Sequence, residues 1–270
     1  MIAELKAIWK NAFGDPDWYI DFFFDRRFVA ENTLVYTADN KPVSMFFMLS
    51  AQINIDGVYK NTFYIYGVST LPEYQGRGYS TALLKFANAH IAENVVATFL
   101  TPASESLFSF YKKQNYKSAF SVKEVDLNLT DLANIPLPDF EFSSIGATGY
   151  TTIRDRAFDC HGYIKWDMAA IEYILAENEL LGGKAYSVQY EDSEHIILYR
   201  TWENKIFVKE TTLEGDLLLG VLKKIMIDEN VSNCNVRLHS ESEINAEVKD
   251  FAMIYGCDKI NNGYLNLVLD

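Results

Sequence analysis

The chain has 270 residues, of which 49% are hydrophobic, so it is long enough for one large or two ordinary domains and too apolar to be disordered. Most of its net charge of −13 lies in residues 136–270, which hold 12 Lys and Arg against 23 Asp and Glu; such acidity argues against a nucleic-acid partner, because phosphates require cationic surface. No apolar run is long enough to span a membrane, the first residues lack the apolar core of a signal peptide, and the three cysteines lack metal-ligand spacing, so we expect a cytoplasmic protein without a metal or membrane contact.

The chain begins with two predicted helices. Apolar residues recur at helical spacing through residues 2–13, and Gly14 ends the pattern. Asp15 followed by Pro16 predicts an N-cap and a proline at the first helical position of a second helix, which runs towards Phe28. The aromatic residues of both helices are expected to line a cleft as well as a core.

Three strands are predicted next. Residues 33–38 and 43–54 are apolar and β-branched, and the Asp-Gly pair at 56–57 predicts a tight hairpin into a strand at 63–68. Gly67 interrupts this last strand, which often indicates a bulge or the close approach of another group.

A glycine-bearing turn follows this strand and leads into a predicted helix with apolar residues at Leu83, Leu84, Ala87 and Ile91. The first amides of a helix have no internal partner and carry partial positive charge, so a turn of this kind suits a phosphate or pyrophosphate. Gly76 and Gly78 would let the anion approach the backbone, and Arg77 could add a charge-assisted contact. The residues of this turn are Gln75, Gly76, Arg77, Gly78, Tyr79 and Ser80.

Known phosphate motifs narrow the choice of ligand. A Walker loop would need a Gly-Lys-Ser/Thr ending, and a dinucleotide-binding module would need a third glycine where this chain has Thr81. The remaining pattern, Gln-x-x-Gly-x-Ser, resembles the acetyl-CoA-binding motif of the GNAT superfamily of N-acetyltransferases, usually Gln/Arg-x-x-Gly-x-Gly/Ala. Ser80 departs from that motif at its last position but is small enough to keep the backbone accessible.

The next elements extend the resemblance over about residues 1–130. A short strand is predicted at 95–100, then a helix capped by Ser104 and ending near Asn115, then a strand at 120–129. The segment SLFSFYKKQNYK is similar to the second landmark of the family, with Tyr111 and Lys113 at the positions of its tyrosine and lysine. Ser104 stands where the family usually has asparagine, and Asn115 where it usually has glycine.

The pattern predicts that the same order of elements begins again after a proline-bearing linker at 131–140. We predict helices at 153–180, strands at 185–190, 195–200 and 205–210, a helix at 217–227, a strand at 235–239, a helix at 243–255 and a strand at 264–269. At the position of the glycine turn, this half has one glycine, Gly215, between two carboxylates that would repel a pyrophosphate. The predicted fold is therefore α/β with a mixed sheet, in tandem: a GNAT-type acetyl-CoA-binding domain at 1–135 and a degenerate GNAT-like domain at 136–270.

The resemblance implies an N-acetyltransferase that moves an acetyl group from acetyl-CoA to a primary amine of a small molecule or peptide within a ternary complex. A backbone N–H near Val68 or Ser69 would hold the oxyanion, Tyr111 would assist the leaving thiolate, and Ser104 together with residues 75–80 would contact the coenzyme. The acidic second half favours a cationic acceptor, or is only a solvated face that aids solubility.

Several alternatives stay open. No Asp or Glu occurs in residues 62–70, so no general base is assigned, although Tyr64 or Tyr66 could act through ordered water. Tyr111 could be a core aromatic residue rather than a catalytic one. The protein could also be a non-catalytic CoA-binding sensor or scaffold, and a homodimer is a possible assembly.

Overall fold

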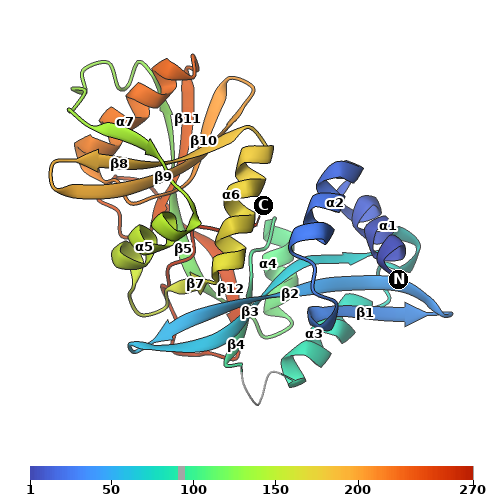
Figure 1. Cartoon of the computed structure of the whole chain (residues 1–270). Coiled ribbons are helices and arrows are strands. Elements are labelled where there is room, and N and C mark those ends of the chain that lie inside the picture. The colour runs from blue at the N-terminus through green and yellow to red at the C-terminus, as the bar shows by residue number, and fades with distance from the viewer. Residues whose placement is uncertain (91–94, 270) are drawn as a thin grey trace. The chain divides into compact units, whose positions relative to one another are not determined.

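The computed structural model describes residues 1–90 and 95–269, which form two compact units (Figure 1). Unit 1 consists of residues 1–119, 164–167 and 252–261, and unit 2 of residues 120–163, residues 168–251 and the residues that follow Asn261. Residues 120–135, placed in the first domain from the sequence, belong to unit 2, whereas residues 164–167 and 252–261, placed in the second domain, belong to unit 1.

Unit 1 is a mixed sheet with two pairs of helices. Its strands lie in the order β1-β2-β3-β4-β12, and β7 pairs with the far end of β2. All neighbours are antiparallel except β3 and β4, which are parallel. The elements are α1 Ile2–Phe13, α2 Asp17–Arg26, β1 Thr33–Ala38, β2 Lys41–Ile55, β3 Val58–Thr70, α3 Tyr79–His90, β4 Ala97–Leu100, α4 Glu105–Lys112, β7 Ile164–Trp166 and the end of β12 Val248–Tyr255, with 3-10 turns at Ala30–Asn32 and Pro72–Tyr74.

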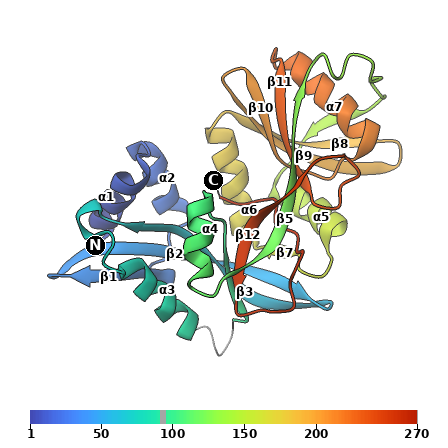
Figure 2. The same cartoon turned by 180° about the vertical axis from the view of Figure 1, so that it is seen from behind.

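The two faces of this sheet are covered by different helices (Figures 1 and 2). Phe47 of β2 contacts Trp9 of α1 and Phe23 of α2, with ring centroids 5.6 and 4.8 Å apart. Its neighbour Phe46 projects to the opposite face, because successive side chains of a strand alternate. There it joins a buried cluster with Leu84 of α3 and Tyr111 of α4. We call these the α1/α2 face and the α3/α4 face.

Most predicted elements of the first half are confirmed, and one cap is wrong. Gly14 ends α1 in the left-handed conformation, and the hairpin at 56–57 has positive φ at both residues. Pro16, not Asp15, is the N-cap residue of α2. The Asp15 carboxylate instead accepts a hydrogen bond from the Trp9 indole N–H at 2.6 Å, which competes with capping. Ile91, predicted at the end of α3, lies outside the described residues.

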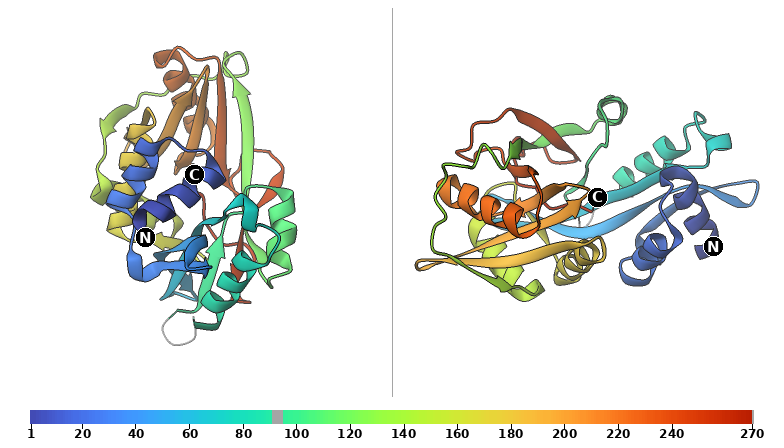
Figure 3. Two further views of the ribbon diagram at one scale, coloured as in Figure 1. Left: turned by 90° about the vertical axis from the view of Figure 1, so that its right-hand side faces the viewer. Right: turned by 90° about the horizontal axis from the view of Figure 1, so that it is seen from above.

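Unit 2 repeats the architecture with its own core. Its strands lie in the order β5-β11-β10-β9-β8-β6, with β10 and β11 parallel and the other pairs antiparallel. Figure 3 shows the chain from two further sides. The elements are β5 Lys117–Asn128, β6 Glu141–Ser144, α5 Ala147–Phe158, α6 Met168–Leu180, β8 Gly183–Tyr190, β9 Ser193–Trp202, β10 Lys205–Thr211, α7 Gly215–Asp228 and β11 Asn233–His239. In both units two helices and an antiparallel meander precede a parallel pair joined by a helix, so the predicted tandem α/β fold is confirmed.

Two predictions in the second half are wrong. Residues 243–255 contain strand β12, not a helix, and its residues Met253–Tyr255 pair with β4. A short apolar run fits a buried strand as well as a helix, and here the sheet edge offered by β4 decides. Residues 264–269 are buried but form no strand, and a single bridge between Gly263 and Phe120 precedes them.

Sequence reasoning also missed β6 and β7, which are only 4 and 3 residues long. None of the helices in the described ranges combines the length and the apolar sequence needed to cross a membrane.

Candidate active site

A bulge distorts the central strand of unit 1. In the register of β3 with β2, Tyr66 lies opposite Phe47 and Ser69 lies opposite Met45, which leaves two residues of β3 against one of β2. These two residues are Gly67 and Val68, and they stand against Phe46 of β2. Gly67 has φ +65°, and a Cβ there would lie 3.1 Å from the Phe47 ring, so both backbone and space require glycine.

The pairing of β3 with β4 stops before this bulge. Their parallel register runs from Thr62 and Ala97 to Tyr64 and Phe99 and ends there, whereas β3 continues to Thr70. The Thr62 hydroxyl donates to the Ala97 carbonyl at 2.8 Å within the paired part. Beyond the last pair, the β4-facing edge of β3 can hydrogen-bond to an extended ligand.

The predicted phosphate turn joins β3 to α3 and is open. Gly76 has φ +72° and Gly78 has φ +83°, and no atom lies within 4 Å of a Cβ built at either position. Among the hydrogen bonds between described residues, none is donated by the backbone N–H groups of residues 76–80; the first bond of α3 runs from the Ala82 N–H to the Gly78 carbonyl at 2.9 Å. The positive end of α3 therefore offers free donors to an anion.

Side chains of the turn fix its position. The Gln75 amide donates to the Thr70 carbonyl at 3.2 Å. The Arg77 guanidinium donates to the Glu73 carbonyl at 2.8 Å and lies over the Tyr74 ring, rather than projecting away from the turn. An anion at this turn would therefore meet backbone N–H groups, with the Arg77 charge beside them.

The turn is also tied to the sheet by aromatic stacking. The Tyr79 ring stacks on Tyr36 of β1 with centroids 4.4 Å apart. Because Tyr79 is the first residue of α3, this contact holds the start of the helix near the edge of the sheet.

Tyr111 lies on the buried side of α4. The Ser104 hydroxyl accepts the Leu107 N–H at 3.4 Å and caps this helix, as predicted. Tyr111 packs in the same cluster as Val68 of the bulge, and its hydroxyl makes no hydrogen bond to another described residue. Burial, with Tyr116 and Tyr64 nearby, raises the pKa of Tyr111 well above its usual range, so the hydroxyl stays protonated and is able to donate a hydrogen bond.

Tyr116, which follows α4, forms a triangle of hydrogen bonds with Thr98 and Asn88. The Tyr116 hydroxyl lies 2.8 Å from the Thr98 hydroxyl of β4 and 3.3 Å from the Asn88 side-chain oxygen of α3, and the last two are 3.1 Å apart. Burial raises the pKa of Tyr116 to about 12. Its ring contacts Tyr111 edge-on at 5.8 Å.

Sequence reasoning missed Ser44. Its hydroxyl donates to the Ser69 carbonyl at 2.8 Å and lies 2.8 Å from the Thr70 hydroxyl, so it fixes the backbone that follows the bulge. Nothing in the sequence distinguishes Ser44 from Ser50, the other serine in the apolar run of β2.

In unit 2, carboxylate side chains stand at the two places that correspond to the glycine turn and the bulge of unit 1. The start of α7 has Glu214 at the N-cap position and Asp216 in the first turn, and Glu214 accepts a hydrogen bond from Ser242 at 2.6 Å. The pairing of β10 with β9 also shifts register, between Val208 and Glu210. The fully buried Glu210 carboxylate accepts hydrogen bonds from Arg154, Tyr150 and Tyr264.

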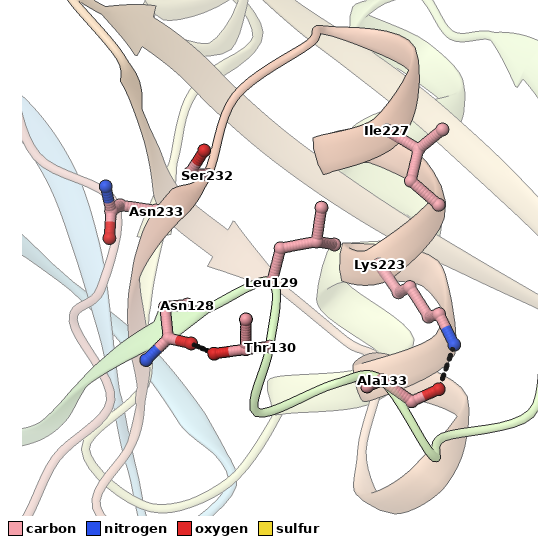
Figure 4. A pocket seen from close by; sticks show the side chains of 8 residues that line it. All are labelled: Asn128, Leu129, Thr130, Ala133, Lys223, Ile227, Ser232 and Asn233. Carbon is pink, nitrogen blue, oxygen red and sulfur yellow. Dashed lines mark hydrogen bonds between the residues drawn. The ribbon is translucent and has the colours of Figure 1, made fainter.

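A pocket of about 630 Å³ opens elsewhere in unit 2 (Figure 4). Lys223 at its wall donates to the carbonyls of Ala133 and Ile135 at 2.9 and 2.8 Å. None of the predicted site residues lines it. The lining residues are Asn128, Leu129, Thr130, Ala133, Lys223, Ile227, Ser232 and Asn233. No group of three metal-ligating side chains occurs within 1–90 and 95–269.

Comparison with known proteins gives one family match. Residues 1–119 match the family model of the acetyltransferase (GNAT) domain, which supports acyl transfer as the class of reaction. No protein with a curated description matches the chain.

Solved structures with the same fold cover almost the whole chain. A protein of unknown function from Enterococcus faecalis, described as a probable N-acyltransferase, is 16% identical with a TM-score of 0.75 over 94% of this chain and 69% of its own. GCN5-related N-acetyltransferases from Anabaena variabilis (17% identity, TM-score 0.70, 94% and 69%) and Kribbella flavida (16%, 0.67, 94% and 68%) are also similar. At these identities the likeness shows the fold.

Proposed function

We propose that this protein transfers an acetyl group from acetyl-CoA to a primary amine of a small molecule or peptide, because residues 1–119 match the family model of the acetyltransferase (GNAT) domain. GNAT acetyltransferases use acetyl-CoA as their co-substrate. The observation that carries the proposal is the open turn at Gly76 and Gly78, whose free N–H groups stand at the positive end of α3 directly after the bulged strand.

The coenzyme would be held mainly by backbone. The N–H groups of residues 76–80 would bind its diphosphate, with Arg77 adding positive charge and Gln75 keeping the turn against Thr70. The pantetheine arm would pair with β3 beyond Tyr64, where β4 no longer does. Ser104, at the start of α4, would contact the coenzyme while capping that helix.

Transfer would proceed by direct attack. The amine nitrogen forms a bond to the thioester carbonyl carbon, and the oxyanion is held by the N–H of Val68 or Ser69 at the bulge. The carbon–sulfur bond then breaks, the nitrogen loses a proton to water, and the thiolate gains one. Tyr111 donates a hydrogen bond to the thiolate; since a thiol has a pKa of about 8.5, below that of a tyrosine, the Tyr111 proton is not itself given up.

Calorimetry with acetyl-CoA tests the proposal. Gly78→Glu places a carboxylate against the diphosphate and should abolish binding. Gly57→Glu is the matched control, because Gly57 also has φ +83° with open space around it but lies in the β2–β3 hairpin. We expect Gly57→Glu to bind acetyl-CoA like the unaltered protein. Equal affinity in both variants would mean that the coenzyme binds elsewhere.

A second function, a non-catalytic CoA-binding sensor or scaffold, is favoured by one observation. β3 carries no Asp or Glu, so the strand that holds the thioester provides no carboxylate base. Thiol release from acetyl-CoA across a panel of primary amines separates the two functions: tight binding without release with any amine identifies the sensor.

For unit 2, we propose a degenerate GNAT-like domain that binds no coenzyme. Carboxylates stand at the start of α7, and Glu210 with its partners occupies the bulge region of β10. A single acetyl-CoA per chain in calorimetry is the expected result, and a second equivalent site would contradict the proposal.

A further inference from the structure

Three buried hydroxyl groups of the described chain have no hydrogen-bond partner. They belong to Ser69, Thr101 and Thr151. Ser69 is only 5% exposed and follows the bulge directly, and Thr101 follows the last residue of β4. Buried hydroxyls are normally satisfied, so an unsatisfied one indicates a partner that the protein alone does not supply. Ser69 lies five residues beyond Tyr64, the last residue of β3 that pairs with β4, and Thr101 lies two residues beyond Phe99, the partner of Tyr64.

The Ser69 side chain lies on the α1/α2 face. Ser69 is directly opposite Met45, and opposite residues of an antiparallel pair project to the same side of the sheet. Met45 shares its side of β2 with Phe47, whose ring contacts Trp9 of α1. The glycine turn leads instead into α3, which packs on the α3/α4 face. The hydroxyl and the start of α3 are therefore on opposite faces of the sheet.

Ser44, on the neighbouring strand β2, is a buried serine whose hydroxyl does have hydrogen-bond partners within the protein. It is fully buried and hydrogen-bonds to both the Ser69 carbonyl and the Thr70 hydroxyl. The Ser69 hydroxyl contributes no such bond, and a buried hydroxyl without a partner destabilises the folded state. Its presence beside the reacting centre is therefore explained better by a ligand than by folding.

We propose that the Ser69 hydroxyl binds the nitrogen of the acceptor amine, and that this amine is borne on an aromatic or apolar group. The inference rests on the proposed function: a coenzyme that arrives from the α3/α4 face leaves the α1/α2 face for the second substrate. A hydroxyl accepts an N–H and thereby turns the nitrogen lone pair towards the thioester. This face of β3 presents Tyr66 beside Trp9, with ring centroids 5.7 Å apart, and no carboxylate that would select a polycation.

The test uses the full chain with 2-phenylethylamine as acceptor and spermidine as the polycationic contrast. In Ser69→Ala we expect kcat/KM for 2-phenylethylamine to fall about tenfold, mainly through KM, as for one lost hydrogen bond of about 1.4 kcal/mol. Acetyl-CoA affinity should stay the same. The midpoint of thermal unfolding should not fall, because no hydrogen bond within the protein is lost.

Two further variants complete the design. Ser69→Thr keeps the hydroxyl and should restore most of kcat/KM. Thr151→Val removes the unpartnered hydroxyl of α5 in unit 2 and should change neither kinetic parameter.

Each contrary result has a separate meaning. Unchanged kinetics in Ser69→Ala, or a fall in its thermal midpoint, would overturn the role of Ser69. Acetyl-CoA binding with turnover of spermidine but not of 2-phenylethylamine, or of neither amine, would overturn the acceptor class. Failure to bind acetyl-CoA would instead remove the proposed function itself.

Discussion

Tyr111 is a residue of the core for which we also propose a role in the reaction. Its ring packs among apolar residues of α3, α4 and β4, while its hydroxyl remains without a partner in the described chain. The sequence predicted the residue from its place in a family landmark, but burial and the direction of its pKa shift required the structure. A tyrosine held neutral in this way is suited to donating a hydrogen bond.

Tyr111→Phe should lower kcat by about 10- to 100-fold, in the range of lost acid assistance, because the thiolate then leaves without a donor. Acetyl-CoA affinity should change no more than a few-fold. Since the pKa of Tyr111 is raised, the rate of the unaltered protein should not decline from its ionisation up to pH 10. Rates at saturating acceptor between pH 6 and 10 check both statements, and an unchanged kcat removes Tyr111 from the reaction.

Tyr116→Phe should destabilise the protein by about 1–3 kcal/mol, because the Thr98 hydroxyl and the Asn88 oxygen lose a buried partner. The effect should depend on pH. The pKa of Tyr116 is about 12 when folded and about 10 when unfolded, so its contribution is full below pH 10 and is lost as the pH rises towards 12. Urea unfolding at pH 7, 10 and 11 measures this, and the variant should show a shallower loss above pH 10.

At the scale of elements, the sequence predicted the helix ends and turns that depend on a few adjacent residues. Gly14, the hairpin at 56–57 and the Ser104 cap were all readable because each depends on a few adjacent residues. Strand β12 was not, since its apolar run fits either helix or strand until β4 provides an edge. The register of the bulge likewise depends on β2, so sequence indicated its glycine but not its two-against-one pairing.

Gly67→Ala tests the bulge as an element. The new methyl would stand 3.1 Å from the Phe47 ring at φ +65°, so we expect a loss of about 2–4 kcal/mol from backbone strain together with overpacking. Gly57→Ala has a similar φ and open space, and should lose only about 1 kcal/mol. Chemical denaturation compares the free energies of unfolding of the two variants. Equal losses would contradict the prediction, because they would mean that the Phe47 ring moves aside without destabilising the protein.

At the scale of the whole molecule, the two units repeat one topology and differ in what fills it. Unit 1 leaves amides and a hydroxyl unpaired around its bulge, whereas unit 2 satisfies the same region with Glu210, Arg154 and three tyrosines. The sequence predicted the repeat from the order of elements. The Arg154–Glu210 ion pair could not be predicted from the sequence, because the two residues are 56 positions apart.

Glu210→Gln should be among the most destabilising single changes in unit 2. It leaves the fully buried Arg154 charge uncompensated, for which we expect a loss of about 3–5 kcal/mol. Asp228→Asn, in an exposed pair with Lys224, should change stability by less than about 1 kcal/mol. Thermal unfolding of both variants checks the contrast, and similar midpoints would show that the buried network is relaxed by water.

Residues 252–261 belong to unit 1, and this affects how the unit folds during translation. During synthesis the ribosome delivers β4 about 150 residues before the segment that pairs with it, Met253–Tyr255. Unit 1 of the nascent chain therefore exposes a strand edge through most of translation, a state that invites self-association or chaperone binding. For the same reason, a recombinant fragment ending near residue 135 would lack this strand and is a poor choice for isolating unit 1.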